Sequence, residues 1–379
     1  MFKWKCLSLF GKIWCEEIIY RIMKTEFMKI ALDCARNVKG KTAPNPAVGA
    51  IIVKDGKFVG RGATSAVGKN HAEINAIIDA GDLCKGADLF VTLEPCSHFG
   101  RTPPCVDAII KAGLKRVFIS CLDPNPLVSG QGIEKLRAAG IEVGTGILEK
   151  EAIRLNEDFF WYIQHKKPFV AAKLALTLDN KIADFQGNSK WITNEKSLNY
   201  THFLRSIYSS IGVGKNTLLA DNPQLTARRI ENAKNPVRIV FSSDENIGRN
   251  SYFRQNSKNR RSIIILNNKE KYKKIADDGV EIWATGETDY KESFLSFLEI
   301  SGNEGIDSIL LEGGSKLIAT ALETQSINRL FLFYAPKIFG SGTDGLMLNN
   351  PLSIESSIKL KDIETQNFDG DILISGLLK

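Results

Sequence analysis

Short apolar segments alternate with segments of helical spacing along most of this chain, and this alternation restricts the fold more than any other feature. Asp88–Leu93 and Arg116–Cys121 are apolar runs of strand length. Segments with apolar residues at helical intervals lie around them, at Ala72–Ala80, Cys105–Ala112 and Gln131–Ala139. Strands joined through helices pair in parallel, because the chain must cross back over the sheet before the next strand. The sequence therefore predicts an α/β fold with a mainly parallel sheet and helices on its faces.

Two further elements precede this alternation. Thr25–Val38 has apolar residues at helical spacing, and Thr25 is a suitable residue to cap the helix. Ala47–Val53 and Lys57–Val59 are apolar runs on either side of Asp55-Gly56, a turn sequence typical of a β-hairpin. We therefore expect a helix followed by a hairpin at the start of the first domain.

A polar, basic segment closed by a proline divides the chain. Gln164–Pro168 reads Gln-His-Lys-Lys-Pro, which is typical of an exposed linker. We therefore predict one domain at residues 23–165 and a second at residues 166–379. Residues 1–22 are an N-terminal extension, either a short appended helix or a stretch ahead of a start at Met23.

The second domain repeats the alternation. Its strands are predicted at Phe169–Ala175, Ser206–Val213, Val237–Phe241, Ser262–Leu266, Ile306–Leu311 and Leu330–Tyr334. Asp244–Arg261 is polar and basic, so we expect a long exposed loop there.

Charge and cysteine content narrow the functional classes. Lys and Arg total 50 against 43 Asp and Glu, which gives a net charge of +7. This charge suits binding of nucleic acid or of a phosphorylated small substrate, but lysines dispersed over the surface are the simpler explanation. Seven cysteines without dense spacing indicate a reducing compartment, which we take to be the cytoplasm. No apolar run is long enough for a spanning helix, and Glu16 and Glu17 interrupt any secretory signal.

The most informative residues are a histidine and two cysteines. His71-Ala72-Glu73 is followed by Pro95-Cys96 and, after eight residues, by Cys105. One imidazole and two thiolates suit Zn²⁺ and leave its fourth position open for water, as in catalytic sites. Zinc brings the pKa of that water to roughly 7, and Glu73 is placed to carry protons from it to the substrate. This His-x-Glu…Pro-Cys pattern is the signature of zinc nucleobase deaminases.

Buried structural thiols and a core histidine are the alternative explanation of these residues. A lone histidine or cysteine usually has such a role. Here the His-x-Glu begins a predicted helix and the Pro-Cys follows a predicted strand, which is the context that the zinc motif requires. The pattern therefore favours the zinc site.

The eight residues between the cysteines form an unusual insert, because nucleic-acid-editing and cytidine deaminases place only two there. The insert carries His98, Arg101 and Thr102 and contains one glycine and two prolines. Such a loop can bind an anion such as a ribose phosphate. A solvated turn is the alternative.

Four segments of the first domain together resemble one family. They are Pro44-Asn45-Pro46-x-Val48-Gly49, His71-Ala72-Glu73, Leu93 to Cys105, and Asp123-Pro124-Asn125-Pro126. The chain resembles the bifunctional riboflavin-biosynthesis deaminase/reductases from about Met23 to its C-terminus. The resemblance implies a cytidine-deaminase-like, three-layer αβα domain that deaminates a diamino-pyrimidinone bearing a phosphoribosylamino group.

The same resemblance implies substrate contacts in the first domain. Asn45 would contact the pyrimidine, and His98, Arg101 and Thr102 would hold the phosphate. One position departs from the family, which usually has Gly-aromatic-His where this chain reads Gly62-Ala63-Thr64. A substrate contact expected from histidine is thus replaced by Thr64 or lost.

Without the family resemblance, the sequence pattern of the second domain does not identify its ligand. Leu310 to Ser315 is an apolar strand followed by a double glycine and a predicted helix, and backbone N–H groups at such a helix start suit a cofactor phosphate. A Gly-Gly turn that only needs permissive dihedral angles is an equal alternative. Gly212-Val213-Gly214 lacks the full spacing of the dinucleotide-binding fingerprint.

The family resemblance continues through the second domain. Its matching segments are Lys173 to Asp179, Gly187 to Thr193, Arg205, Thr217 to Arg228 and Ala335 to Gly340. They imply a dihydrofolate-reductase-like α/β domain that uses NADPH to reduce the ribosyl group to ribityl. The residues that would face the cofactor are Ala175, Trp191, Thr217, Asp221, Gly314, Ser315, Lys316, Leu317, Ile318, Ala319 and Thr320. Those that would face the substrate are Lys173, Ser189, Arg205, Leu225, Arg228 and Glu312, with both arginines suited to its phosphate.

Two positions of the second domain depart from the family. Asn180 replaces a glycine, and Asn328-Arg329 replaces Asp-Glu. Neither position has an obvious catalytic role, and no general acid or base is assigned in this domain.

The leading hypothesis is a two-step enzyme with Zn²⁺ and NADPH, acting on a small phosphorylated pyrimidine. We expect a homo-oligomer without a nucleic-acid or membrane partner. A nucleic-acid-editing deaminase is the alternative from another class, but it requires a short cysteine spacing. A chain in which only the reductase half is active is the third possibility, and Thr64 is the only hint of it.

Overall fold

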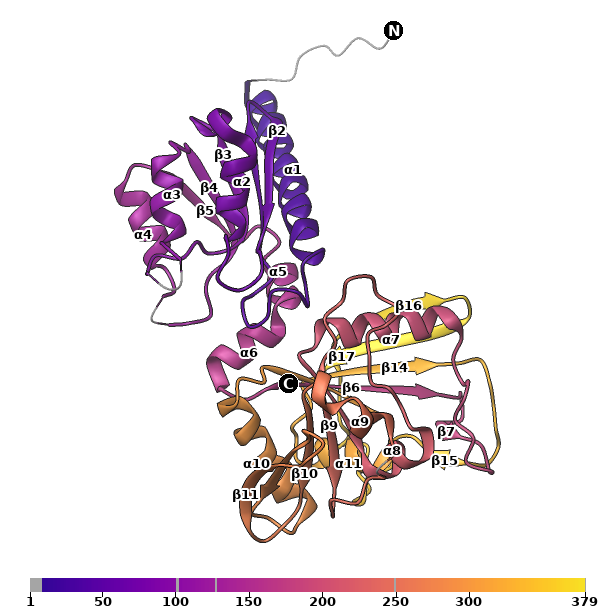
Figure 1. Cartoon of the computed structure of the whole chain (residues 1–379). Helices are drawn as coiled ribbons and strands as arrows, with labels where there is room; N and C mark the ends of the chain where they lie inside the picture. Colours follow the sequence, from indigo (N-terminus) through magenta and orange to yellow (C-terminus); the bar gives the residue numbers. More distant parts are fainter. Residues whose placement is uncertain (1–8, 100–101, 127, 249, 379) are drawn as a thin grey trace. The chain divides into compact units, whose positions relative to one another are not determined.

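The chain folds into two compact units. The computed structural model describes residues 9–99, 102–126, 128–248 and 250–378, with side chains from Tyr20 onward (Figure 1). The units are Met1–Gln164 and His165–Lys379. None of the described helices is both long and apolar enough to cross a membrane.

A five-stranded sheet is the centre of the first unit. Its spatial order is β2-β1-β3-β4-β5; β1 is antiparallel to both neighbours, whereas β3, β4 and β5 are parallel. The strands are β1 (Gly49–Lys54), β2 (Lys57–Ala63), β3 (Asp88–Leu93), β4 (Arg116–Cys121) and β5 (Glu142–Thr145). The predicted hairpin is therefore confirmed as β1 and β2, with Asp55 and Gly56 both at positive φ in its turn.

Helices cover both faces of this sheet. They are α1 (Leu9–Arg36), α2 (Ala72–Ala80), α3 (Cys105–Lys111), α4 (Gln131–Ala138), α5 (Glu149–Leu155) and α6 (Glu157–His165), with a 3₁₀ turn at Gly81–Cys84. Ile51 and Val53 of β1 pack against Met28 and Ala31 of α1. The alternate residues of β1 face the core that α2, α3 and α4 complete. Because successive side chains of a strand point to opposite faces, the result is the predicted three-layer αβα arrangement.

One prediction about the first helix is wrong. Thr25 does not cap it, because α1 begins at Leu9 and Thr25 lies in its interior, where its hydroxyl donates to the carbonyl of Arg21 at 3.1 Å. A threonine inside a helix can bond the carbonyl of the preceding turn instead of capping. Part of the N-terminal extension therefore belongs to α1.

Ten strands form the sheet of the second unit. The order is β11-β12-β10-β9-β8-β13-β6-β14-β17-β16, with seven parallel strands from β12 to β14 and antiparallel strands at both ends. The strands are β6 (Phe169–Leu176), β8 (Ser210–Gly214), β9 (Val237–Ser242), β10 (Ser262–Leu266), β11 (Lys271–Ile275), β12 (Glu281–Thr285), β13 (Ser308–Glu312), β14 (Arg329–Tyr334), β16 (Lys361–Phe368) and β17 (Asp371–Leu377). A separate pair joins β7 (Lys181–Ala183) to β15 (Thr343–Asp344).

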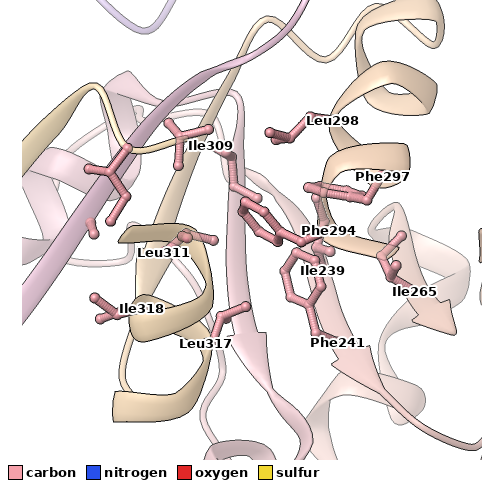
Figure 2. Close-up of a cluster of buried hydrophobic side chains, with 14 of the residues drawn as sticks. Ile239, Phe241, Ile265, Phe294, Phe297, Leu298, Ile309, Leu311, Leu317 and Ile318 are labelled. Carbon is pink, nitrogen blue, oxygen red and sulfur yellow. The ribbon is translucent and has the colours of Figure 1, made fainter. Parts of the chain in front are cut away.

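Helices α10 (Tyr290–Asn303) and α11 (Ser315–Glu323) cover one face of this sheet. Figure 2 shows Phe294, Phe297 and Leu298 of α10 with Leu317 and Ile318 of α11, packed against side chains from the strands. The other face carries α7 (Glu195–Ile207), α8 (Lys215–Asp221) and α9 (Tyr252–Gln255), followed by a 3₁₀ turn at Ser257–Asn259.

Two predictions in the second unit need correction. The strand predicted at Ser206–Val213 starts only at Ser210, because α7, capped by Asn194, continues to Ile207. The region Asp244–Arg261 is not simply an exposed loop. It contains α9, and its apolar residues Ile247 and Phe253 are both fully buried, so they anchor this polar segment to the core.

Candidate active sites

Helix α2 places the predicted histidine and glutamate of the first unit. His71 is the N-cap residue, and its ring makes no capping hydrogen bond, which leaves it available as a ligand. Glycine at position 62 lets β2 lie directly against this helix, because a Cβ there would come within 2.1 Å of the Ala72 carbonyl oxygen. The close approach of β2 and α2 therefore supports the start of the helix.

Cys96 and Cys105 meet His71 at this helix start. Cys96 follows β3, and Cys105 is the first residue of α3. The His71 Nδ1 lies 3.2 Å from the Cys105 Sγ and 3.6 Å from the Cys96 Sγ. All three ligand atoms lie within 4.8 Å of one another. The Cys105 backbone N–H also donates to the Cys96 sulfur at 3.3 Å.

The chemistry of these three side chains fits a zinc ion. The hydrogen bond from Cys105 and the proximity of His71 lower the pKa of the Cys96 thiol below its ordinary value. A cluster of one imidazole and two thiols, one of them readily deprotonated, matches the ligand preference of Zn²⁺. Three protein ligands also leave a fourth tetrahedral position for water or substrate.

Glu73 lies beside these ligands and is 3% exposed. Burial raises the pKa of its carboxyl to about 7. A carboxyl with a pKa near neutrality can both accept and donate a proton at neutral pH. Glu73 therefore has the environment of a general acid–base.

Glu94 is a supporting residue of the site that the sequence reasoning missed. Its buried carboxylate accepts hydrogen bonds from the backbone N–H groups of Gly130 and Gly132, each at 3.0 Å, and of Asp123 at 3.3 Å. Lys135 donates to the Ser97 carbonyl at 2.6 Å. These contacts hold the chain on both sides of Cys96. A charged residue between an apolar strand and Pro95-Cys96 was the signal that could have revealed it.

The structure describes only part of the eight-residue insert between Cys96 and Cys105. His98 is exposed, and the Thr102 hydroxyl lies 3.5 Å from the His71 Nε2, on the ring side opposite the two sulfurs. Arg101 lies outside the described residues. Asn45 is half-buried in the loop before β1, with its backbone bonded to Thr42. Their substrate contacts remain predictions.

Thr64, the departure from the family pattern, is buried and bonded to the backbone. Its hydroxyl accepts from the Val48 N–H at 3.0 Å and lies 3.4 Å from the Val48 carbonyl. This side chain therefore stabilises the junction between β1 and β2.

In the second unit, Arg205 and Glu312 form a bidentate ion pair. The Arg205 Nε and Nη2 each donate to a Glu312 carboxylate oxygen at 2.7 Å, and Nη1 donates to the Thr226 carbonyl at 3.3 Å. Burial alone would raise the pKa of Glu312, but Arg205 and Lys173 keep it below its ordinary value. Arg228 stands next to this pair and bonds the Thr226 hydroxyl at 3.2 Å.

Three of the predicted cofactor residues, Thr217, Asp221 and Gly314, follow the carboxyl ends of β8 and β13. Gly313 and Gly314, both at positive φ, follow β13 and lie against Thr217 of α8. A Cβ would come within 2.9 Å of Thr217 at the first glycine and 3.0 Å at the second. Ser189 donates to the Asp221 carboxylate at 3.1 Å. Ligands of open α/β sheets bind at this edge.

Comparisons with known proteins agree with this geometry. Residues 168–374 match the RibD C-terminal domain, and residues 22–121 match the cytidine and deoxycytidylate deaminase zinc-binding region. The riboflavin biosynthesis protein RibD of Aquifex aeolicus is 42% identical over 356 residues, which cover 93% of this chain and 98% of the relative. The chain belongs to the RibD family.

Other members of the RibD family are also similar to this chain over most of its length. RibD of Escherichia coli is 35% identical over 338 residues, covering 84% of this chain and 89% of the relative. A solved structure from Thermotoga maritima, described as a diaminohydroxyphosphoribosylaminopyrimidine deaminase/5-amino-6-(5-phosphoribosylamino)uracil reductase, is 40% identical with a TM-score of 0.83, covering 95% of this chain and all of that one. RibD of Acinetobacter baumannii is 30% identical with a TM-score of 0.82, covering 95% of this chain and 99% of that one. Both predicted folds are thereby confirmed, the cytidine-deaminase-like fold and the dihydrofolate-reductase-like fold of the RibD reductase half.

Several side chains of the second unit that were predicted to face a ligand are buried in the structure. Leu225 is 1% exposed and packs in the core. Leu317, Ile318, Ala319 and Thr320 are also buried, and Leu317 and Ile318 belong to the core under α11 (Figure 2). Contacts of these residues with a ligand stay a prediction. Gly314, Ser315 and Lys316 remain accessible, as do Ala175 in part and Trp191, which is 63% exposed.

The departures from the RibD pattern in the second unit are accommodated locally. Asn180 adopts φ +61°, a conformation that asparagine tolerates better than most residues. Its neighbour Asp179 accepts from the N–H groups of Phe339 and Gly340, which joins two of the family segments. The Asn328 Oδ1 accepts from the Val170 N–H at 2.8 Å. These three residues therefore have structural roles.

His202 is a second residue that the sequence reasoning missed. It lies on α7 one turn before Arg205 and is 5% exposed. Burial, together with the charges of Arg205 and Arg228, lowers its pKa to about 4. The region around Arg205 and Arg228 thus contains a neutral imidazole beside two guanidinium groups. Its sequence signal was only its spacing of three residues from Arg205.

Proposed function

We propose that the two units catalyse consecutive reactions of riboflavin biosynthesis. Residues 23–165 remove the amino group of 2,5-diamino-6-(phosphoribosylamino)pyrimidin-4-one by hydrolysis. Residues 166–379 then reduce the ribosyl group of the product to ribityl with NADPH. The observation that carries this function is the grouping of His71, Cys96 and Cys105 around the buried Glu73, in a chain of the RibD family.

His71, Cys96 and Cys105 hold the zinc ion of the first unit. When bound, zinc supplies a Lewis acid that makes water a nucleophile at neutral pH. Glu73 takes both protons of the attacking water in turn and delivers the first to the ring nitrogen and the second to the departing amine. Its burial keeps its pKa close to the pH at which both transfers occur. Glu94 and Lys135 keep the loop of Cys96 in position.

Substrate specificity in the first unit comes from groups around the zinc ligands. Asn45 contacts the pyrimidine, and the insert with His98, Arg101 and Thr102 holds the phosphate. The proximity of Thr102 to the His71 ring supports a place for this loop at the mouth of the site.

The second unit positions NADPH against the sugar. When bound, NADPH supplies the hydride. The backbone at Gly313, Gly314 and Ser315 begins a nine-residue helix and suits a cofactor phosphate. Thr217, Asp221 and Trp191 line the same cofactor region.

The substrate phosphate is bound mainly by Arg228. Arg205 has donors already committed to Glu312 and Thr226, whereas Arg228 is exposed and keeps most of its donors. Arg205 and Glu312 therefore act as a rigid support, and Lys173 and Ser189 complete the substrate side. The family resemblance implied that both arginines bind the phosphate, and we now assign phosphate binding mainly to Arg228.

The partners and the location follow from the same chemistry. The substrate is a small phosphorylated pyrimidine, and the eight-residue insert argues against a nucleic-acid partner. We place the enzyme in the cytoplasm because its cysteines are dispersed and odd in number. By analogy with its family, we also propose that it is a homo-oligomer without a membrane partner.

One experiment tests both reactions separately. The purified chain is incubated with the diamino-pyrimidinone phosphate, with and without NADPH, while ammonia release and NADPH oxidation are measured independently. We expect ammonia release without NADPH, loss of it after removal of zinc by a strong chelator, and recovery on adding zinc. With the deaminated compound as substrate, NADPH oxidation should persist after chelation. Metal analysis of the active protein should give one zinc per chain.

Three outcomes would contradict the proposal. Active protein without zinc or a substitute metal would refute the metal site. NADPH oxidation without ammonia release would leave only the reductase half active. Deamination of cytidine in single-stranded nucleic acid, but not of the pyrimidinone, would favour an editing enzyme.

A further inference from the structure

A cavity beside Arg238 lies apart from the residues assigned to catalysis. It has a volume of about 240 Å³ and is lined by Gln224, Arg238, Tyr252, Asn256 and Arg260. None of the residues proposed to bind substrate or NADPH is among them. Arg238 is at the start of β9, whereas the cofactor residues lie at the carboxyl ends of β8 and β13, which run parallel to it. The Arg238 cavity is therefore lined on one side from the amino-terminal ends of these strands, and on another by Gln224, three residues beyond Asp221.

Arg238 brings a positive charge to the lining of the cavity, and no described residue forms an ion pair with it. It is 1% exposed, and it donates to the carbonyls of Tyr252 and Phe253 at 3.0 and 2.9 Å and to the Ser262 hydroxyl. All these acceptors are neutral. Burial, and then the charge of Arg260, lowers the pKa of Arg238 to about 10. The guanidinium remains charged at neutral pH, and its charge is not compensated.

Arg260 adds a second positive charge to the same wall. It is half-buried, and among the residues that the structure describes no carboxylate lies within ion-pair distance of either guanidinium. By contrast, the neighbouring Arg254 and Arg261 pair with Asp278 and with Glu281, respectively. Two buried or half-buried like charges without a counter-charge are unfavourable, so the cavity favours an anion.

The remaining lining groups can also donate hydrogen bonds. The Gln224 amide and the Tyr252 hydroxyl have no hydrogen-bond partner within the described part of the chain, and one N–H of the Arg238 Nη1 is left over after its bond to Tyr252. Guanidinium groups bind tetrahedral oxyanions through paired N–H donors. The volume is several times the ~30 Å³ of a water molecule, which leaves room for an oxyanion and a small attached group.

We infer that the Arg238 cavity is a second anion site of this chain, which binds a phosphate group between the Arg238 and Arg260 guanidinium groups and the Gln224 amide. The phosphate is either free or part of a phosphomonoester. This site goes beyond the proposed function, since neither reaction uses it.

Equilibrium titration of the full chain tests this site. Inorganic phosphate and ribose 5-phosphate are titrated at constant ionic strength, in an Arg101→Ala/Arg228→Ala background that weakens the substrate phosphate sites proposed in the two units. Arg260→Gln should weaken phosphate binding by about tenfold or more, because a charged donor is lost. Gln224→Ala should weaken it less. Lys258→Gln removes a nearby positive charge that does not line the cavity and should leave the affinity within about twofold, so it controls for net charge.

The controls separate this site from catalysis and from misfolding. Arg260→Lys should recover part of the affinity if a positive charge is what binds. In the otherwise unchanged enzyme, Arg260→Gln should not alter deamination or reduction, so failure of the proposed function would leave this test intact. Tighter binding of ribose 5-phosphate than of phosphate would identify a phosphomonoester, and equal affinities would identify the free ion. Unchanged phosphate affinity in a folded Arg260→Gln variant would overturn the inference.

Discussion

The Arg205 guanidinium and the Glu312 carboxylate, 107 residues apart in the chain, form two parallel hydrogen bonds of 2.7 Å in the interior of the second unit. The side chains retain only 14% and 10% exposure, respectively. Removing one partner of a buried pair leaves the other as an uncompensated charge. This pair joins α7 to the end of β13, next to the Gly-Gly turn.

Arg205→Ala should therefore destabilise the second unit, by about 3–5 kcal/mol. The measurement is the melting transition that NADPH shifts upward, since that transition belongs to the unit that binds NADPH. Arg205→Ala/Glu312→Gln should recover part of the loss, because the unpaired negative charge is removed. Equal melting of the single and double variants would contradict this account of the pair.

Arg228→Ala should raise KM for the deaminated pyrimidine and leave NADPH affinity nearly unchanged. A charge-assisted contact of about 1.5–3 kcal/mol is lost on the substrate side only. Titration with NADPH, followed by steady-state kinetics with varied pyrimidine, separates the two ligands. Loss of NADPH binding with unchanged KM for the pyrimidine would reverse the placement of the ligands.

Glu73→Gln should keep zinc but lose deamination by about 10²–10⁴-fold or more, because an amide cannot transfer protons. Zinc content and ammonia release are the measurements. Reduction of the deaminated compound should be unaffected and serves as the internal control. Ammonia release within about tenfold of the parent rate would assign the proton transfers to another group.

Gly314→Val should weaken NADPH binding. Gly314 has φ +69°, and a Cβ would come within 3.0 Å of the Thr217 Oγ1 where the cofactor phosphate is expected. Gly305→Val is a matched control, since Gly305 has φ +74° but open space around it. Both variants carry the same kind of backbone strain, so only Gly314→Val should raise the Kd of NADPH. Equal effects on the Kd would show that strain alone is responsible.

His202 should make the second unit less stable as the pH falls from about 6.5 to about 4. The unfolded chain binds a proton at the ordinary histidine pKa of 6.5, whereas the folded chain binds it only near 4. Stability therefore rises with pH across this window, by at most about 3 kcal/mol from this group. His202→Gln should remove that part of the pH dependence, and the exposed His165→Gln should not. Parallel stability–pH curves for the parent and His202→Gln would contradict the prediction.

Much of the local structure and the metal ligands could be predicted from the sequence alone. The bounds of β3, α2 and β4 agree with the predicted segments residue by residue. Alternation and helical spacing are local properties, so they are present in the sequence itself. The zinc ligands were also predictable, because metal binding restricts both the residue types and their spacing.

The tertiary structure alone decided which side chains pair or pack with one another. It assigns Arg205 to Glu312, buries Leu225 and gathers three backbone N–H groups on Glu94. Among the residues that the structure describes, it leaves Arg238 and Arg260 without a carboxylate partner. These relationships join segments far apart in the chain, and they depend on how both faces of each sheet are packed. Local periodicity can tell that a side chain faces inward, but its partner is set by the register and packing of distant elements.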